Sequence, residues 1–90
     1  MFVKRTILRY ITFLLKLAGR MDRIKLKEFG SHLRQLRIER NLTQEKLAFK
    51  GDFDRNYIGM LERGERNPSL LNLIRLSNAL SLSLKDLIDY

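Results

Sequence analysis

The alternation of apolar and polar residues between positions 42 and 64 predicts two short helices joined by a tight turn. Thr43 suits the start of the first helix, because its side-chain oxygen can accept a hydrogen bond from an otherwise unpaired amide of the first turn. Leu42 and Leu47 flank it at the spacing of a hydrophobic staple. Asp54 repeats this pattern with a staple of its own. The two helix starts therefore leave room for one short helix and a turn between them.

Apolar stripes on both sides of this segment predict three further helices. In residues 24–40 the stripe has the spacing i, i+4, i+7 and consists of Phe29, Leu33 and Leu36. Ser69 is the predicted N-cap of the next helix, whose buried face we expect to be Leu70, Leu73, Ile74, Ser77 and Leu80. Ser83 is predicted to cap a short last helix. We expect the apolar side chains of that helix partly to close the core and partly to form a dimer seam; they are Leu84, Leu87 and Ile88.

Residues 1–20 differ from the rest of the chain and predict an amphipathic basic helix. One face holds apolar residues at helical spacing, namely Ile7, Leu8, Ile11, Leu14, Leu15 and Ala18. Another face holds Arg5, Arg9, Thr12 and Lys16. The longest uncharged run there, Tyr10 to Leu15, is far shorter than the roughly twenty residues that a membrane span needs. Residues 19–22 are the predicted linker to the domain.

Three hypotheses for residues 1–20 stay open at this point. The segment packs on the domain or on a second subunit, or it lies on an anionic membrane surface. Alternatively it precedes the true start of the protein, which would then be Met21. Residues 21–90 contain all the other predicted helices in each case.

Composition excludes several classes of function. Ninety residues allow one domain, and the absence of cysteine excludes thiol chemistry and the common cysteine-containing zinc sites. His32 is the only histidine, so we expect no metal site. Neither a catalytic triad nor a glycine-rich phosphate loop is evident. We therefore expect no enzyme activity and no cofactor.

The net charge of +8 indicates affinity for nucleic acid, but its distribution weakens that inference. Eight of the eighteen basic residues, and only two of the ten acidic ones, lie in residues 1–28. The remainder of the chain is nearly balanced in charge. A case for DNA binding must therefore depend on the motif between residues 43 and 62.

That motif resembles the helix-turn-helix of the lambda-repressor-like (Cro/CI, Xre-type) DNA-binding domains. The resemblance is carried by Gln44, Ala48, Phe53, Ile58, Leu61, Glu62 and Gly64. It extends to Gly30, Leu33, Leu36 and Arg37 on one side and to Asn67-Pro68-Ser69 and the last two helices on the other. It implies an all-α fold with five helices in residues 21–90, and the N-terminal amphipathic helix is then an extra element. Turns where the family prefers glycine hold Asn41, Asp52 and Ser81, which predicts strain or shifted helix ends.

The resemblance implies that the helix over residues 55–62 enters the major groove of DNA. The outward positions, and thus the candidate base-reading residues, are Arg55, Asn56, Gly59 and Met60. Arginine suits the two acceptors of guanine, asparagine suits adenine, and Met60 could contact a thymine methyl. Gly59 has two open interpretations: it lets the backbone approach DNA closely, or no side chain is needed there.

Other residues are expected to hold the DNA backbone, which gives affinity and register without sequence information. The candidates are Thr43, Gln44, Tyr57, Arg63, Arg66 and Asn67. Gln44 is implied to bind a phosphate and to brace the recognition helix. Tyr57 either reaches a phosphate or packs against the preceding helix. The resemblance also implies a partly buried ion pair between Arg37 and Glu62.

The sequence thus predicts a sequence-specific, double-stranded-DNA-binding transcriptional regulator, acting as a homodimer on a palindromic operator. We expect it in the cytoplasm, associated with the nucleoid, where it blocks RNA polymerase or contacts it. Proteins of this size that resemble it include phage repressors, restriction–modification controllers and antitoxins. The alternative is an antitoxin-like or partner-binding interaction module that uses the same fold without reading bases.

Overall fold

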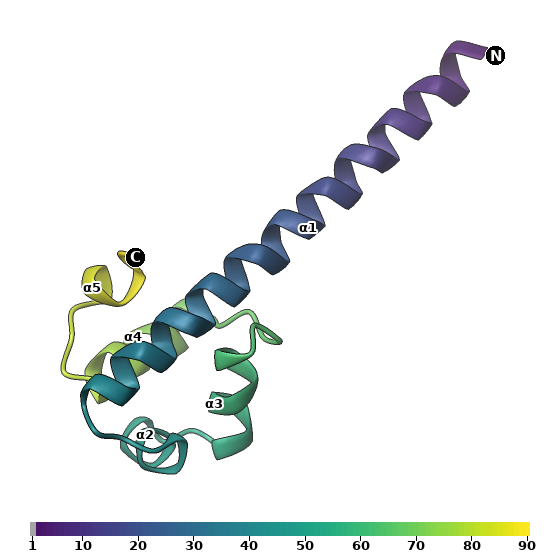
Figure 1. Cartoon of the computed structure of the whole chain (residues 1–90). Coiled ribbons are helices and arrows are strands. Elements are labelled where there is room, and N and C mark those ends of the chain that lie inside the picture. Colours follow the sequence, from purple (N-terminus) through teal and green to yellow (C-terminus); the bar gives the residue numbers. More distant parts are fainter. Residues whose placement is uncertain (1) are drawn as a thin grey trace.

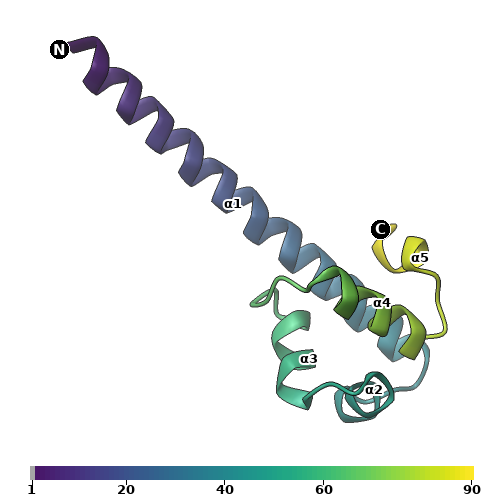
Figure 2. The same ribbon diagram turned by 180° about the vertical axis from the view of Figure 1, so that it is seen from behind.

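The computed structural model describes the backbone of residues 2–90 and the side chains of residues 5–90. Throughout that part of the chain the regular structure is helical, which confirms the all-α class. The helices are α1 (Phe2–Glu39), α2 (Gln44–Gly51), α3 (Arg55–Glu62), α4 (Leu70–Ala79) and α5 (Leu84–Ile88). Helices α2 to α5 gather at the C-terminal end of α1, while its N-terminal part projects away from them (Figures 1 and 2).

The predicted extra helix is not a separate element, because α1 continues without interruption through residues 19–22, where the linker was predicted. Gly19 is the most helix-weakening residue of that segment. One glycine costs about 1 kcal/mol relative to alanine, which does not break a helix flanked by good helix formers. The result is one helix of 38 residues and a molecule 59 Å long. No helix among the described residues is long and apolar enough to cross a membrane.

The four predicted N-caps are confirmed. The side chains of Thr43, Ser69 and Ser83 each accept a hydrogen bond from the amide three residues later, at 3.1 Å. Asp54 accepts one from the amide of Asn56 at 2.8 Å. These bonds satisfy amides that a helix start leaves unpaired, so they fix where α2 to α5 begin.

The three turns that lack glycine adopt the left-handed conformation that glycine would favour. The φ angles are 56° at Asn41, 57° at Asp52 and 57° at Ser81. The left-handed conformation is most tolerable for asparagine and aspartate, so Ser81 carries the greatest strain. In each case the next amide bonds the carbonyl five residues back: Leu42 to Arg37 (3.1 Å), Phe53 to Ala48 (2.8 Å) and Leu82 to Ser77 (2.8 Å). The helix ends are thus retained at the cost of local strain.

The turn between α2 and α3 is also held from α4. The Arg75 guanidinium donates to the backbone carbonyls of Gly51 and Asp52. It also lies 4.2 Å from the ring centroid of Phe53. A long-range contact therefore fixes the angle between the two helices of the motif.

The core contains apolar side chains from all five helices; its fully buried large residues are Leu33, Leu47, Ile58, Leu61, Leu76, Leu80 and Leu87. The prediction of which α4 side chains are buried is partly wrong. Leu70 is 64% exposed and Ile74 is 38% exposed, whereas Leu76 is fully buried. Leu73, Leu76 and Leu80 form an equally periodic stripe, and packing against α2 and α5 selects it.

Helix α1 crosses α3 so closely that only glycine fits at position 30. A Cβ atom built on Gly30 would lie 2.5 Å from the Glu62 carbonyl oxygen and closer still to that of Leu61. Gly64 lies against α1 as well: its φ is 75°, and a Cβ there would come within 2.9 Å of the Lys27 backbone. Both contacts fix the position of the recognition helix relative to α1.

A buried ion pair joins α1 to α3 at the same crossing. The Nε of Arg37 donates to Glu62 Oε2 at 2.7 Å, and its Nη2 donates to Oε1 at 2.9 Å. The third donor, Nη1, bonds the Leu42 carbonyl at 2.8 Å, and Gln44 Nε2 donates to Glu62 Oε1 at 3.2 Å. The hydrogen bond to Glu62 raises the pKa of Arg37. The Arg37 and Glu62 side chains are only 11% and 3% exposed, so the pair implied by the resemblance is present and well buried.

Gly30→Ala should lower the free energy of unfolding by about 1–3 kcal/mol, because the new methyl meets backbone atoms that cannot turn aside. Urea unfolding followed by circular dichroism measures this. Gly19→Ala is the matched control, since a Cβ there meets nothing within 4 Å. We expect the control to be neutral or stabilising by up to about 1 kcal/mol. Equal behaviour of the two variants would contradict the close crossing.

Arg37→Met and Glu62→Met should each cost about 3–5 kcal/mol, because each leaves a buried charge without its partner. The double variant should cost much less than the sum of the two, since no unpaired charge remains. A double-mutant cycle in urea measures the coupling. Additive losses would mean that the two side chains do not interact in solution.

Candidate nucleic-acid interface

A shallow groove of about 190 Å³ lies where α3 begins. It is lined by Gln44, Arg55, Asn56, Gly59, Met60 and Arg63. The structure therefore brings all the predicted base-reading residues together with two of the predicted phosphate contacts. Thr43, Tyr57, Arg66 and Asn67 are not among the lining residues.

Arg55 and Asn56 are exposed on the first turn of α3. The Asp54 cap orients this turn through the Asn56 amide. Among the described residues neither the Arg55 guanidinium nor the Asn56 side-chain amide has a hydrogen-bond partner. Both groups can therefore offer paired donors and acceptors to base edges without breaking an internal bond.

Gly59 lines the groove but is buried. A Cβ at this residue would lie 3.1 Å from Arg63 Nη1 and 3.7 Å from Gln44 Oε1. The absence of a side chain thus leaves room for those two polar groups above the helix. The spacing of α3 alone could not show this, because Gln44 comes from another helix.

Met60 is half-buried, and its sulfur accepts a hydrogen bond from Arg66 Nε at 3.3 Å. Tyr57 packs inward: its ring stacks on Phe53 with centroids 5.6 Å apart. Its hydroxyl accepts a hydrogen bond from Asn72 Nδ2 of α4 at 2.9 Å. Packing against the preceding helix was one of the two predictions for Tyr57; the contacts found here are with Phe53 of the turn and Asn72 of α4. Its hydroxyl proton is still available to an acceptor.

The loop after α3 carries the exposed cationic groups. Arg63 holds Glu65 through two hydrogen bonds, of 2.8 and 3.1 Å. This contact raises the pKa of Arg63 and lowers that of Glu65. Arg66 and Asn67 are exposed in the same loop. Arg63 must therefore exchange or share its carboxylate partner to hold a phosphate.

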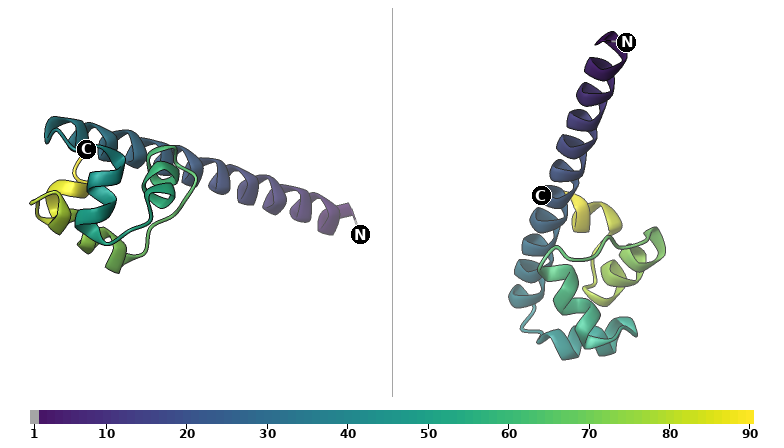
Figure 3. Two further views of the ribbon diagram at one scale, coloured as in Figure 1. Left: turned by 90° about the horizontal axis from the view of Figure 1, so that it is seen from below. Right: turned by 90° about the vertical axis from the view of Figure 1, so that its right-hand side faces the viewer.

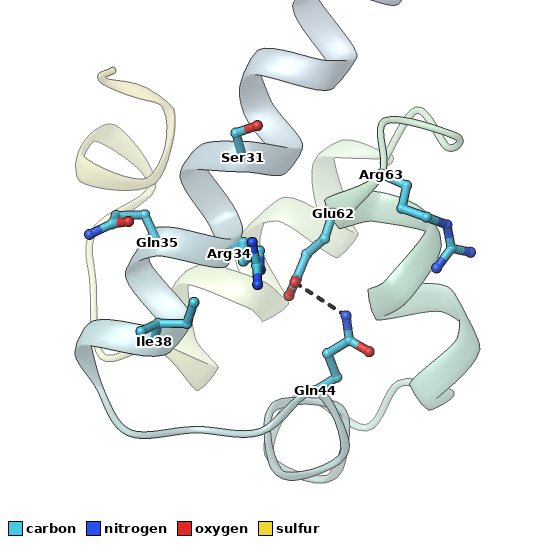
Figure 4. Close-up of a pocket in the computed structure, with 7 residues that line it drawn as sticks. All are labelled: Ser31, Arg34, Gln35, Ile38, Gln44, Glu62 and Arg63. Atoms are coloured by element: carbon cyan, nitrogen blue, oxygen red, sulfur yellow. Dashed lines mark hydrogen bonds between the residues drawn. The ribbon is translucent and has the colours of Figure 1, made fainter.

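A larger hollow of about 580 Å³ adjoins the groove and is lined by Ser31, Arg34, Gln35, Ile38, Gln44, Glu62 and Arg63. Gln44 and Arg63 line both hollows. Figure 4 shows the Gln44 amide bonded to Glu62, while the Arg63 side chain points away from this pair. We did not predict Arg34 as a site residue from the sequence. Its position three residues before Arg37 was the available signal, because the two share one side of α1.

Comparison with known proteins places this geometry in a family. Residues 33–87 match the family model HTH_3, described as Helix-turn-helix. Control protein C.BamHI of Bacillus amyloliquefaciens is 49% identical over 63 residues, covering 69% of this chain and 78% of that protein. Control protein C.MunI of Mycoplasma sp is 43% identical over 68 residues, covering 74% and 90%.

A solved structure agrees with these relatives. The crystal structure of the restriction-modification controller protein C.AhdI from Aeromonas hydrophila has a TM-score of 0.68 and 47% sequence identity. The match covers 69% of this chain and 94% of that one. The chain therefore belongs to the helix-turn-helix family, within its lambda-repressor-like (Cro/CI, Xre-type) group, and is a DNA-binding transcriptional regulator.

Proposed function

We propose that this protein binds as a homodimer to an operator whose two half-sites lie about one helical turn apart. It then acts as a controller of restriction–modification genes. The observation that carries the operator-binding proposal is the groove at the start of α3, which combines unpaired base-reading groups with polar groups at its rim. The names of the relatives support the biological role.

The groups around the groove divide into two roles. Arg55 and Asn56 read base edges, because their side chains are exposed and have no internal partner in the described structure. Gln44 braces α3 through its hydrogen bond to Glu62. It also lies at the start of α2, where the backbone amides attract anions and can bind a phosphate. Arg63, Arg66 and Asn67 contact the DNA backbone. Tyr57 packs against Phe53 and Asn72 and donates its hydroxyl proton to a phosphate.

The dimer contact that we propose uses the exposed part of α5. Leu87 is fully buried in the core of its own domain, so it cannot form the seam that its apolar character indicated. Ile88 is 51% exposed and Leu84 is half-buried, and these two remain the candidates. Binding in the nucleoid of the cytoplasm would then regulate transcription by blocking RNA polymerase or by contacting it.

Selection of bound sequences from a random duplex library tests this function. We expect the full chain to enrich a palindromic motif with two half-sites, because each subunit presents one α3 helix. Circular dichroism of the same sample controls for folding. A folded protein that enriches no motif would contradict operator binding and would favour the partner-binding alternative.

Arg55→Ala should weaken operator binding by about 1–3 kcal/mol and relax the preference at one base position. Arg66→Ala should instead weaken all sequences alike and reduce the salt slope by about 1 unit, since it removes one phosphate contact. Titration of matched and mismatched duplexes at several salt concentrations distinguishes the two effects. The same response from both variants would contradict the division into base-reading and backbone-binding residues.

A further inference from the structure

The projecting part of α1 exposes an unusual number of apolar side chains. Ten large hydrophobic residues between positions 7 and 24 are 43–68% exposed: Ile7, Leu8, Tyr10, Ile11, Phe13, Leu14, Leu15, Leu17, Met21 and Ile24. Most of the stability of a helix in a protein comes from packing of its apolar face, and here the described chain provides nothing to pack against. A continuous apolar surface of this kind indicates an interaction site.

The order of these residues fits a helix that pairs with another helix. Spacings of four and three alternate along Ile7, Ile11, Leu14, Ala18 and Met21, which is the repeat of a coiled-coil seam. The positions that flank this seam are apolar too: Leu8, Tyr10, Leu15 and Leu17. On the opposite side of the helix, Arg9, Lys16 and Arg23 recur every seven residues. A partner on the seam would therefore leave these cations in solvent.

A second copy of the chain is the occupant that fits best. The seam positions 7, 11, 14, 18 and 21 hold no charged residue, so the seam itself offers no charge for an oppositely charged partner to recognise. It is apolar along its length and therefore complementary to itself. One of its two alternating positions holds Ile11 and Ala18, and the other holds Ile7, Leu14 and Met21. In a parallel coil, a β-branched residue such as Ile11 at the first position and leucine at the second favour two strands.

The C-terminus supports the same assignment. The seam positions Ile11 and Ala18 are seven residues apart, and two further steps of seven lead to Lys25 and His32. Tyr90 covers that line: its hydroxyl lies 3.5 Å from the Lys25 carbonyl oxygen and its ring stacks 4.9 Å from that of His32. Figure 3 shows the C-terminus beside α1, below the projecting part. The uncovered seam thus begins beyond the part of α1 that Tyr90 covers.

We propose that residues 7–21 of α1 pair with the same segment of a second copy as a parallel, two-stranded coiled coil. This inference rests on the homodimer proposed above and gives it a second contact. In a parallel pair both domains lie at one end of the coil, so two α3 helices can face one duplex. An antiparallel pair would separate the domains by about the length of the projecting segment, roughly 30 Å at 1.5 Å per residue.

Sedimentation equilibrium of the full chain without DNA tests the pairing. The variant Ile11→Lys/Leu14→Lys places two charges in the seam. The matched control Thr12→Lys/Gly19→Lys adds the same two charges seven residues apart on another face, where a Cβ at Gly19 meets nothing within 4 Å. We expect the seam variant to raise the dimer dissociation constant at least about tenfold and the control to stay within about threefold of the unmodified chain.

Disulfide cross-linking tests the parallel direction, since the natural chain has no cysteine. Ile7→Cys and Met21→Cys lie at the same seam position, two repeats apart. In a parallel coil each variant alone should oxidise to a covalent dimer. Cross-linking only in a mixture of the two would overturn the parallel arrangement.

Other results would overturn the pairing itself. They are a monomeric full chain, or an association that the seam variant leaves unchanged. Binding of the full chain to anionic vesicles, lost in the seam variant while neither variant alters self-association, would assign the stripe to a membrane surface instead. Because sedimentation is measured without DNA, a failed operator selection leaves this test unaffected. Ile88→Lys tests the α5 contact separately.

Discussion

The arrangement of this protein depends on the buried bidentate pair between Arg37 and Glu62. The Nη1 group of Arg37 donates a hydrogen bond to the Leu42 carbonyl, and Glu62 also accepts one from the side-chain amide of Gln44. One charged cluster thereby ties α1 to the last turn of α3 and to the first turn of α2. A buried pair is costly to desolvate, but a guanidinium that makes three hydrogen bonds to two residues fixes geometry strongly. The recognition helix is held at the angle that this cluster permits.

Steric contact reinforces the electrostatic one. Gly30 lets the backbones of α1 and α3 approach within a distance that excludes any side chain, and Gly64 brings the following loop against Lys27. Helix α1 therefore acts as a rigid support for the whole DNA-binding surface. The same rigidity carries the projecting half of α1 outward as a straight continuation, where its apolar seam meets no part of the described domain.

Specificity and charge lie in different parts of the molecule. The domain that contains the groove is nearly balanced in charge, and Arg63 there is already bound to Glu65. Affinity for DNA must therefore depend on a few well-placed groups rather than on a strong overall field. Most of the excess positive charge lies in residues 1–28, where Arg9, Lys16 and Arg23 line the side of α1 opposite the seam and would stay exposed in a pair of copies.

The sequence by itself determined the features that depend on neighbouring residues. Thr43, Asp54, Ser69 and Ser83 begin helices because capping is a hydrogen bond across two or three residues. The motif and the Arg37–Glu62 pair were accessible through family resemblance. Tertiary structure alone decided which stripe of α4 is buried, that Gln44 and Arg63 cover Gly59, and that Tyr57 turns toward Asn72. The unbroken course of α1 through Gly19 is instead a local matter, because good helix formers flank that glycine and a Cβ built there meets nothing within 4 Å. Two stripes of equal periodicity on α4 differ little in local free energy, so only contacts with distant segments decide which of them is buried.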